Sequence, residues 1–425
     1  MCCNIAALFL FQQEHISSWT FTKMHSFGKT AASALLVIIC LLATECQGNQ
    51  YDPHLYPSNG PFFEGWYLRL VDKAKKISLG FLFGRVLPCN FSLRVDSRQL
   101  SAVHSRKSDF SLELCDLNQH KDNPLVLAGV LVQDRNFSQK LHSFNGAFSV
   151  TDYSVTVKGK PVLHDPDDKS PADFSVKFGN NGSFSVSPYQ TLVDVTVGNV
   201  SLFIQSGNHV PWGPHGEGPE GWLEHLPFPL HWFVYSLRST VTKYRFYDSA
   251  SGRKIDGANA RLHMEKNWGQ SFPAAWVWSQ GLTETNITLA LSGGIVDFQV
   301  LNTTAFLVGY RNPAKNIVWN FTPANSVSAF IHDGCQGLVK LNLTGLFHKL
   351  AIKIVSPSSY FSECLLGPER DGFSPVCVES YDAVISVTAY KRRGFDFVEV
   401  DRVDIYDAAL EFGGKYVCKD KCSHL

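Results

Sequence analysis

The chain lacks any excess of charge, since its 425 residues carry 38 Lys plus Arg and 38 Asp plus Glu. No extended basic face is present, which argues against a nucleic acid as partner. The GxSxG, Walker, GxGxxG and HExxH patterns are also missing, so the common hydrolases, nucleotide enzymes and zinc proteases are not first candidates. We therefore expect neither a cofactor nor a metal ion. Methionine is scarce, whereas aromatic residues make up 13% of the chain, as in proteins that enclose an apolar molecule.

Long helical periodicity is scarce after residue 48, and short alternating runs take its place. In the run LAIKI at 350–354, for example, the large apolar residues Leu350, Ile352 and Ile354 alternate with Ala351 and Lys353. Gly, Asn and Asp interrupt such runs at short intervals, as at Asp256-Gly257 and Asp371-Gly372. Many short strands separated by turn residues indicate an all-β protein, either a sandwich or an antiparallel barrel.

Residues 1–48 are not expected to belong to the fold. From Met24 the chain carries Lys29, an apolar run at 31–43 and a short polar end at 46–48. This is the pattern of a secretory signal peptide, with cleavage near Gly48 and an upstream extension before Met24. The apolar run is short for a bilayer span, and no later segment resembles one, so we expect no stable transmembrane anchor.

Sequons for N-glycosylation support export of the chain. They occur at Asn90, Asn136, Asn181, Asn199, Asn286, Asn302, Asn320 and Asn342. So many sites spread through one chain indicate a glycoprotein that is secreted or held in the ER lumen.

Cysteines after the signal are expected to form disulfides in such an oxidising compartment. They are Cys89, Cys115, Cys335, Cys364, Cys377, Cys418 and Cys422, and the odd count leaves at least one free or intermolecular. We expect Cys364 to pair with Cys377, and Cys418 or Cys422 to pair with a distant partner. Because only one CxxxC is present, we interpret 418–425 as a loose tail rather than a metal site.

The length of the chain after the signal indicates two domains. The run PWGPHGEGP at 211–219 cannot continue a strand ladder, because proline supplies no N–H donor. We expect a loop here that crosses between the two halves. The predicted boundary lies near Ser239, with one unit at 49–239, a second at 240–417 and a tail at 418–425.

Acidic and aromatic residues are densest at 264–280. This segment brings Glu265, Asn267 and Gln280 together with the indoles of Trp268, Trp276 and Trp278. An earlier run, FFEGWY at 62–67, also places a carboxylate near a tryptophan, here two residues apart. Residues two apart in a strand share a face, so Glu64 and Trp66 point together, as do Trp276 and Trp278. Both runs are candidates for the wall of one pocket.

These motifs resemble the tocopherol cyclase family. The run PFFEGWY at 61–67 is similar to that family's amino-terminal signature. The run EKNWG at 265–269, with Phe272-Pro273 and the spaced Trp276, Trp278 and Gln280, is similar to its central signature, and AALEFGG at 408–414 is similar to its last strand. The likeness extends from about Pro61 to Tyr416.

The resemblance implies two lipocalin-like antiparallel β-barrels packed together. It also implies an intramolecular lyase that closes the chroman ring of a prenylated hydroquinone, with an apolar prenylated small molecule as partner. The secretory signal favours a different substrate or an alternative function, a secreted lipocalin-like protein that binds a lipid or prenylquinone without turnover. A third alternative is a glycoprotein with no apolar ligand. The sequence does not define the oligomeric state.

Cyclisation of this kind needs a protonated acid, because protonation of a trisubstituted alkene gives the tertiary carbocation that the phenol oxygen captures. A carboxyl group buried beside indoles has its pKa raised by desolvation, and indole faces stabilise cations. Glu265 is the first candidate and Glu64 the second. Alternatively, Glu265 forms a buried ion pair with Lys266, Arg69 or Arg85, and Glu64 satisfies backbone donors.

The remaining candidates each have a structural alternative. The indoles of Trp66, Trp268, Trp276 and Trp278 line the pocket or close the barrel ends. Asn267 and Gln280 hold a phenol or quinone oxygen, or bond to exposed strand edges. His231 and His263 act as proton shuttles or as structural groups. Lys266 lowers the pKa of the phenol, or points away from the side chain of Glu265.

Overall fold

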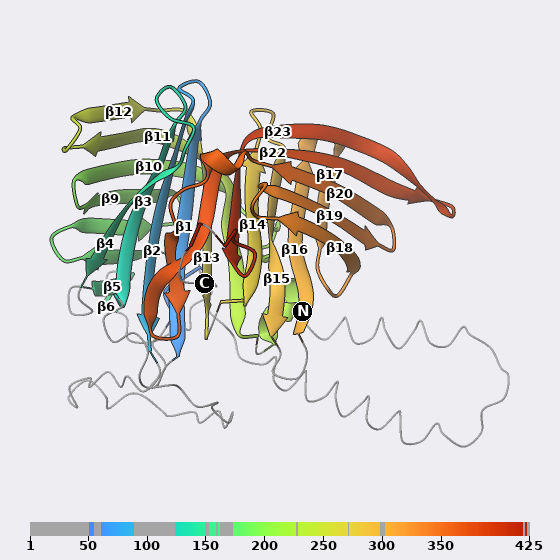
Figure 1. Ribbon diagram of the computed structural model, residues 1–425, viewed down its shortest axis with the longest axis horizontal. Coiled ribbons are helices and arrows are strands. Elements are labelled where there is room, and N and C mark those ends of the chain that lie inside the picture. Colours follow the sequence, from blue (N-terminus) through green and yellow to red (C-terminus); the bar gives the residue numbers. More distant parts are fainter. Residues whose placement is uncertain are drawn as a thin grey trace, which may run out of the picture. The chain divides into compact units, whose positions relative to one another are not determined.

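A computed structural model describes residues 51–54, 61–88, 124–148, 153–158, 160–161, 173–226, 228–270, 272–297, 302–419 and 421–422. The predicted signal peptide, the sequon at Asn90, and Cys89 and Cys115 lie outside these residues. Figure 1 colours the chain along its sequence and labels most of its strands.

Two antiparallel sheets make up nearly all of the described chain. The first contains β1 (Phe62–Asp72), β2 (Ile77–Leu87), β3 (Val126–Asp134), β4 (His142–Phe148), β5 (Tyr153–Val157), β6 (Lys160–Pro161), β7 (Phe174–Phe178), β8 (Gly182–Val186), β9 (Gln190–Val197), β10 (Val200–Val210), β11 (Leu230–Asp248), β12 (Arg253–Gly257) and β13 (Ala260–Gly269). The second contains β14 (Ala275–Leu282), β15 (Thr288–Asp297), β16 (Asn302–Asn312), β17 (Ile317–Phe321), β18 (Ser326–Asp333), β19 (Leu338–Gly345), β20 (His348–Val355), β21 (Leu365–Glu369), β22 (Gly372–Arg393) and β23 (Asp396–Gly414).

Helical structure is limited, in the described residues, to short 3₁₀ turns at η2 (Gly221–His225), η3 (Pro313–Lys315) and η4 (Ser358–Tyr360). None of these turns has the length or apolar character of a membrane-crossing helix. The prediction of an all-β protein built from two antiparallel units is confirmed. Each sheet encloses an apolar core of its own.

The alternation of side chains decides what faces the space between the sheets. In β1, Trp66 and Leu68 belong to the first core, while Tyr67 makes its hydrogen bonds to the second sheet. In β14, Val277 belongs to the second core, whereas Trp278 joins a third apolar cluster that draws on both sheets. A strand with both faces buried carries two independent sets of side chains.

The chain changes sheet later than the sequence suggested. The predicted boundary near Ser239 falls within β11, which pairs with β13, so the first sheet continues to Gly269 and the second begins at Ala275. The predicted crossing point is the loop at 211–219. It instead connects β10 to β11, and these two strands pair with each other.

Disulfides hold the carboxyl-terminal segment, so the prediction of a loose tail is wrong for its described residues. Cys335 pairs with Cys418, and Cys364 pairs with Cys422. The distant partner expected for Cys418 or Cys422 is confirmed. The predicted pair of Cys364 with Cys377 is wrong, because Cys422 packs into the second core and takes the place of Cys377, which is a buried free thiol.

Candidate functional site

A cavity of about 340 Å³ lies between the two sheets. Strands β1, β2, β11 and β13 contribute to its lining from the first sheet, and β14–β16 and β21–β23 from the second. The lining is largely apolar, with Leu82, Phe272, Leu307 and Phe373 among its members. A few polar side chains converge on this apolar space, which is the usual composition of a small-molecule site.

Glu265 projects from β13 into this space. Its side chain is 6% exposed, and its Oε2 lies 2.8 Å from Nε2 of His263. The same oxygen accepts a hydrogen bond of 3.0 Å from the indole Nε1 of Trp278 across the gap. The contacts of Glu265 thus join the two sheets, and they differ from the ion pair with Lys266, Arg69 or Arg85 considered as its structural alternative.

Two further carboxyl groups line the cavity from the second sheet. Glu379 on β22 and Glu411 on β23 are directly opposite each other in the strand register. Burial raises the pKa of Glu411 to about 7, with a contribution from the negative charge of Glu265. Burial raises the pKa of Glu379 well above its usual value, and the charge of Glu411 adds to this effect. Like charges that share a buried site cannot all ionise, so this cluster retains protons at neutral pH.

Tyr67 connects Glu379 to the first sheet. Its hydroxyl donates to Oε1 of Glu379 at 2.6 Å and lies 2.7 Å from the hydroxyl of Tyr381. The guanidinium of Arg69 lies 4.7 Å from the centre of the Tyr381 ring. Oε2 of Glu379 has no hydrogen-bond partner among the described residues. That oxygen is itself almost fully buried, on a residue that lines the cavity.

Trp276 contributes an indole to the wall beside Glu411. Its Nε1 donates to Oε1 of Glu411. The indole lies across β23 at Gly413, where a Cβ would stand 1.9 Å from Cε2 of Trp276. Glycine at this position of the AALEFGG run is thus required for the packing of the indole.

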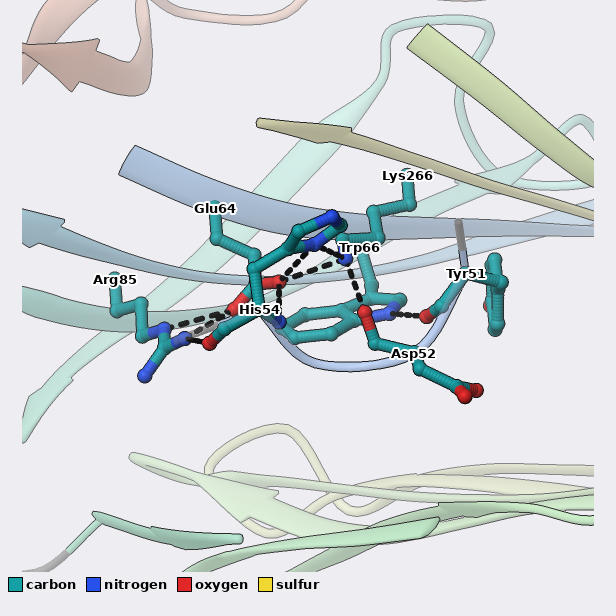
Figure 2. A network of polar contacts seen from close by, with 7 residues as sticks. All are labelled: Tyr51, Asp52, His54, Glu64, Trp66, Arg85 and Lys266. Atoms are coloured by element: carbon teal, nitrogen blue, oxygen red, sulfur yellow. Dashed lines mark hydrogen bonds and ion pairs between the residues drawn. The ribbon is translucent and has the colours of Figure 1, made fainter. Parts of the chain in front are cut away.

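Glu64 belongs to a different, fully compensated network, shown in Figure 2. Its carboxylate lies 2.6 Å from Nη2 of Arg85 and 2.7 Å from Nζ of Lys266, and it accepts from the backbone N–H of His54 at 2.6 Å. Burial alone raises the pKa of Glu64, but the two cations and His54 outweigh burial and hold the pKa well below its usual value. Glu64 is therefore ionised and has no proton to donate.

The same network anchors the segment that precedes β1. Lys266 also contacts the carbonyl of Asp52, and the indole of Trp66 donates to the carbonyl of Tyr51 at 3.2 Å. Lys266 and Glu265 are neighbours in one strand, so their side chains leave opposite faces of it. Lys266 accordingly points away from Glu265 and compensates Glu64.

The predicted site residues separate into two groups. Glu64, Trp66, Glu265, Asn267, Trp276 and Trp278 all contribute to the cavity lining, although the ring of Trp66 packs in the first core. Trp268 and Gln280 are not part of the lining. Trp268 stacks between the rings of His54 and His231 at 4.5 and 5.2 Å, and Gln280 accepts from Nη1 of Arg69 at 2.8 Å.

The two histidines proposed as shuttles differ in position. His263 contacts Glu265 directly and is fully buried. His231 instead lies 2.8 Å from Glu220, whose other oxygen accepts the backbone N–H of Trp232. His263 is therefore the histidine that contacts the cavity's carboxyl cluster.

Sequence reasoning missed Tyr67, Glu379 and Glu411. Each carried a signal that was not used. Tyr67 directly follows Trp66 in the first motif, and Glu411 lies inside the AALEFGG run. Glu379 interrupts the apolar stretch of β22 with a charged residue, and buried carboxyl groups of this kind frequently mark functional sites.

The cavity suits acid chemistry on an apolar molecule. It offers protonated carboxyl groups and indole faces that stabilise a cation. The thiol of Cys377 also reaches the lining, but burial and the neighbouring Glu411 raise its pKa, so it remains neutral and unreactive.

Comparison with known proteins identifies similar sequences and one similar fold. A family model described as tocopherol cyclase-like matches residues 199–414. A probable chloroplastic tocopherol cyclase of Oryza sativa subsp. japonica is 24% identical over 208 residues, which are 46% of this chain and 42% of that protein. The chloroplastic tocopherol cyclase of Zea mays is 27% identical over 169 residues, covering 38% of this chain and 34% of that protein.

The alignments thus span less than half the length of these relatives. Among solved structures, that of CghA is similar with a TM-score of 0.49 at 10% identity, covering 86% of this chain and 96% of that one. The family model alone extends over half of the sequence, from β10 through β23. The chain belongs to the tocopherol cyclase-like family.

Proposed function

We propose that this protein is an acid-catalysed intramolecular lyase that cyclises a prenylated hydroquinone, or a related isoprenoid, in the cavity between its sheets. The observation that carries the proposal is the carboxyl group of Glu411, which lines an apolar cavity beside Trp276 and has a pKa of about 7. A general acid works best when its pKa is near the operating pH.

In the proposed reaction, Glu411 transfers its proton to the trisubstituted alkene of the prenyl chain. The tertiary carbocation that results lies against the faces of Trp276 and Trp278. The phenol oxygen then bonds to the cationic carbon and loses its proton to a carboxylate of the cluster. In this proposal Glu265 receives it, since Glu265 lines the cavity and contacts His263. The proton gained by the alkene carbon balances the proton lost by the phenol, so the reaction is an isomerisation.

Substitution of Glu411 by glutamine tests this role, because a carboxamide preserves shape but has no acidic proton. We expect Glu411→Gln to lose about 10²- to 10⁴-fold in turnover of a prenylated hydroquinone. Glu399→Gln is the matched control, since Glu399 lies on the same strand but is exposed and pairs with Arg402. Wild-type turnover in Glu411→Gln, with loss of turnover in Glu265→Gln, would assign the donor to Glu265 instead.

A carrier without turnover is the second candidate function. The disulfides Cys335–Cys418 and Cys364–Cys422 favour it, because they are typical of an oxidising compartment, whereas the plant cyclases that resemble this chain are chloroplastic. Quenching of the fluorescence of Trp276 and Trp278 would report binding of a prenylated hydroquinone. Saturable quenching with no chroman product, in wild type and Glu411→Gln alike, would establish the carrier.

We propose further that the chain enters the secretory pathway and is N-glycosylated. The two disulfides support this route, as do the sequon residues Asn136, Asn181, Asn199, Asn320 and Asn342, all of which are exposed. Expression of the full chain in animal cells, followed by treatment with a peptide N-glycosidase, should lower the apparent mass of the protein. An unchanged mass would contradict the route.

A further inference from the structure

The last strand of the second sheet carries an exposed apolar stripe. β18 lies at one end of the strand order of that sheet. Along its outer face, Val327 is 76% exposed and Ile331 is 63% exposed, with the exposed Ala329 between them. An uncovered, β-branched stripe on a strand of this kind invites pairing with other chains, and stable proteins protect such strands.

Asn342 lies beside the centre of this stripe. It is on β19, directly opposite Ala329, and it is exposed. Directly opposite residues on antiparallel strands have Cβ atoms about 4.5–5.5 Å apart, and diagonal neighbours are about 7–8 Å away. Val327 and Ile331 are those diagonal neighbours. Asn342 is therefore a direct or diagonal neighbour of every residue of the stripe.

The surroundings of Asn342 leave room for a large group. On its other side, β20 places Ala351 directly opposite it. Small side chains thus flank Asn342 on both neighbouring strands, while Lys340 and Lys353 pair with each other farther along the same face. Asn342 also begins the sequon Asn342-Leu343-Thr344, in which the buried Leu343 points into the core and Thr344 shares the outer face.

We propose that Asn342 carries an N-linked glycan that lies over the Val327–Ile331 stripe and protects β18 from pairing. The proposal rests on the secretory route proposed above. In the modification, Nδ2 of Asn342 bonds to the anomeric carbon of a lipid-pyrophosphate-linked oligosaccharide. The bond from that carbon to the pyrophosphate breaks, and Nδ2 gives up one proton.

Two substitutions of one residue provide a matched test. Thr344→Ala destroys the sequon and leaves Asn342 unmodified, whereas Thr344→Ser preserves the sequon. In full chains secreted from animal cells, we expect glycopeptide mass spectrometry to find a glycan on Asn342 in the wild type and in Thr344→Ser. We expect Thr344→Ala to elute from size-exclusion chromatography with a larger mass and to bind more of a dye that reports apolar surface.

A rescue experiment separates shielding from a local structural effect. Replacing Val327 and Ile331 by threonine in Thr344→Ala should return the elution volume to that of the wild type. Asn199→Gln removes a sequon from the β9–β10 turn and should not change self-association. A glycan on Asn199 with none on Asn342 would overturn the shield and leave the secretory route intact. Absence of glycans from every sequon would overturn both. A glycosylated Asn342 whose loss leaves self-association unchanged would also overturn the shield.

Discussion

The carboxyl groups on the two sides of β13 differ in their protonation. On one face, Lys266 joins Arg85 in compensating Glu64, and the pKa of Glu64 is held low. On the other face, the side of Glu265, the carboxyl groups of Glu379 and Glu411 have raised pKa values. Glu64 and Glu379 are both buried, and Glu411 is partly buried, so burial alone does not decide their protonation. The protonation is decided by how many cations and hydrogen-bond donors contact each carboxyl group.

This difference assigns different roles to identical side chains. A compensated carboxylate holds segments together, because its partners come from separate parts of the chain: His54, Arg85 and Lys266 all meet at Glu64. An uncompensated carboxyl group keeps its proton and becomes an acid. Substitutions of Glu64, Glu379 and Glu411 test whether the two faces behave in these two ways.

The largest expected effect follows from removing the charge of Glu64. In Glu64→Gln, Arg85 and Lys266 stay buried without their counter-charge, and we expect a loss of about 3–5 kcal/mol in the free energy of unfolding. Glu379→Gln is the matched comparison, since that carboxyl group is already neutral, and its loss should be below about 1 kcal/mol. Urea unfolding followed by tryptophan fluorescence measures both. Equal losses in the free energy of unfolding in the two variants would contradict the proposed difference in protonation between Glu64 and Glu379.

The carboxyl groups on the two faces contribute to the pH dependence of the free energy of unfolding with opposite signs. In the unfolded chain Glu411 titrates near 4.5, whereas in the fold its pKa is about 7. Between these values the folded state holds the extra proton, so the free energy of unfolding falls as pH rises from 4.5 to 7, by at most about 1.4 kcal/mol per pH unit for one group. Glu64 has a lowered pKa, so its contribution is present above pH 4.5 and is lost as pH falls below it.

Unfolding curves collected from pH 3 to 8, roughly the range in which these groups titrate, distinguish the two contributions. Glu411→Gln should reduce the slope between pH 4.5 and 7, to which Glu379 also contributes through its raised pKa, and leave the decline on the acid side in place. Glu399→Gln, on the exposed part of β23, should leave the region from 4.5 to 7 unchanged. An unaltered slope in Glu411→Gln would show that Glu411 is ionised in the folded protein at neutral pH.

Local patterns in the sequence predicted the all-β class and the positions of Glu265, Trp276 and Trp278 at the cavity. Alternation is a property of neighbouring residues, and it can be read without knowing which strands pair. The acid role of Glu64 could not be assessed in this way. Its protonation depends on Arg85 and on other residues that strand pairing brings to it from distant parts of the sequence.

The same limit explains the other differences between sequence and structure. Glu379 and Glu411 meet because β22 pairs with β23 in one particular register, and nothing in either strand alone defines that register. The boundary near Ser239 was misplaced because β11 pairs with both β10 and β13. Disulfide pairing likewise depends on which segments lie together in the fold, so the sequence did not identify Cys422 as the partner of Cys364.

The smallest effect is expected from a phenol that contacts a neutral carboxyl group. Tyr67→Phe removes the donor that lies 2.6 Å from Oε1 of Glu379. Because Glu379 is protonated, we expect a cost of about 0.5–1.5 kcal/mol, the usual value for a hydrogen bond between neutral groups. The hydrogen bond from Tyr67 lowers the pKa of Glu379, so its removal raises that pKa further and leaves the group neutral.

Tyr310 offers a matched control in the second core. Its hydroxyl donates to Oδ2 of Asp401, also at 2.6 Å. Burial alone raises the pKa of Asp401, but hydrogen bonds from Tyr310, Asn312 and Lys315 hold it below its usual value. Tyr310→Phe therefore removes a donor from a charged group and should cost about 1.5–3 kcal/mol. A larger loss in the free energy of unfolding for Tyr67→Phe than for Tyr310→Phe would mean that Glu379 carries a negative charge. The cavity would then not contain a cluster of neutral acids.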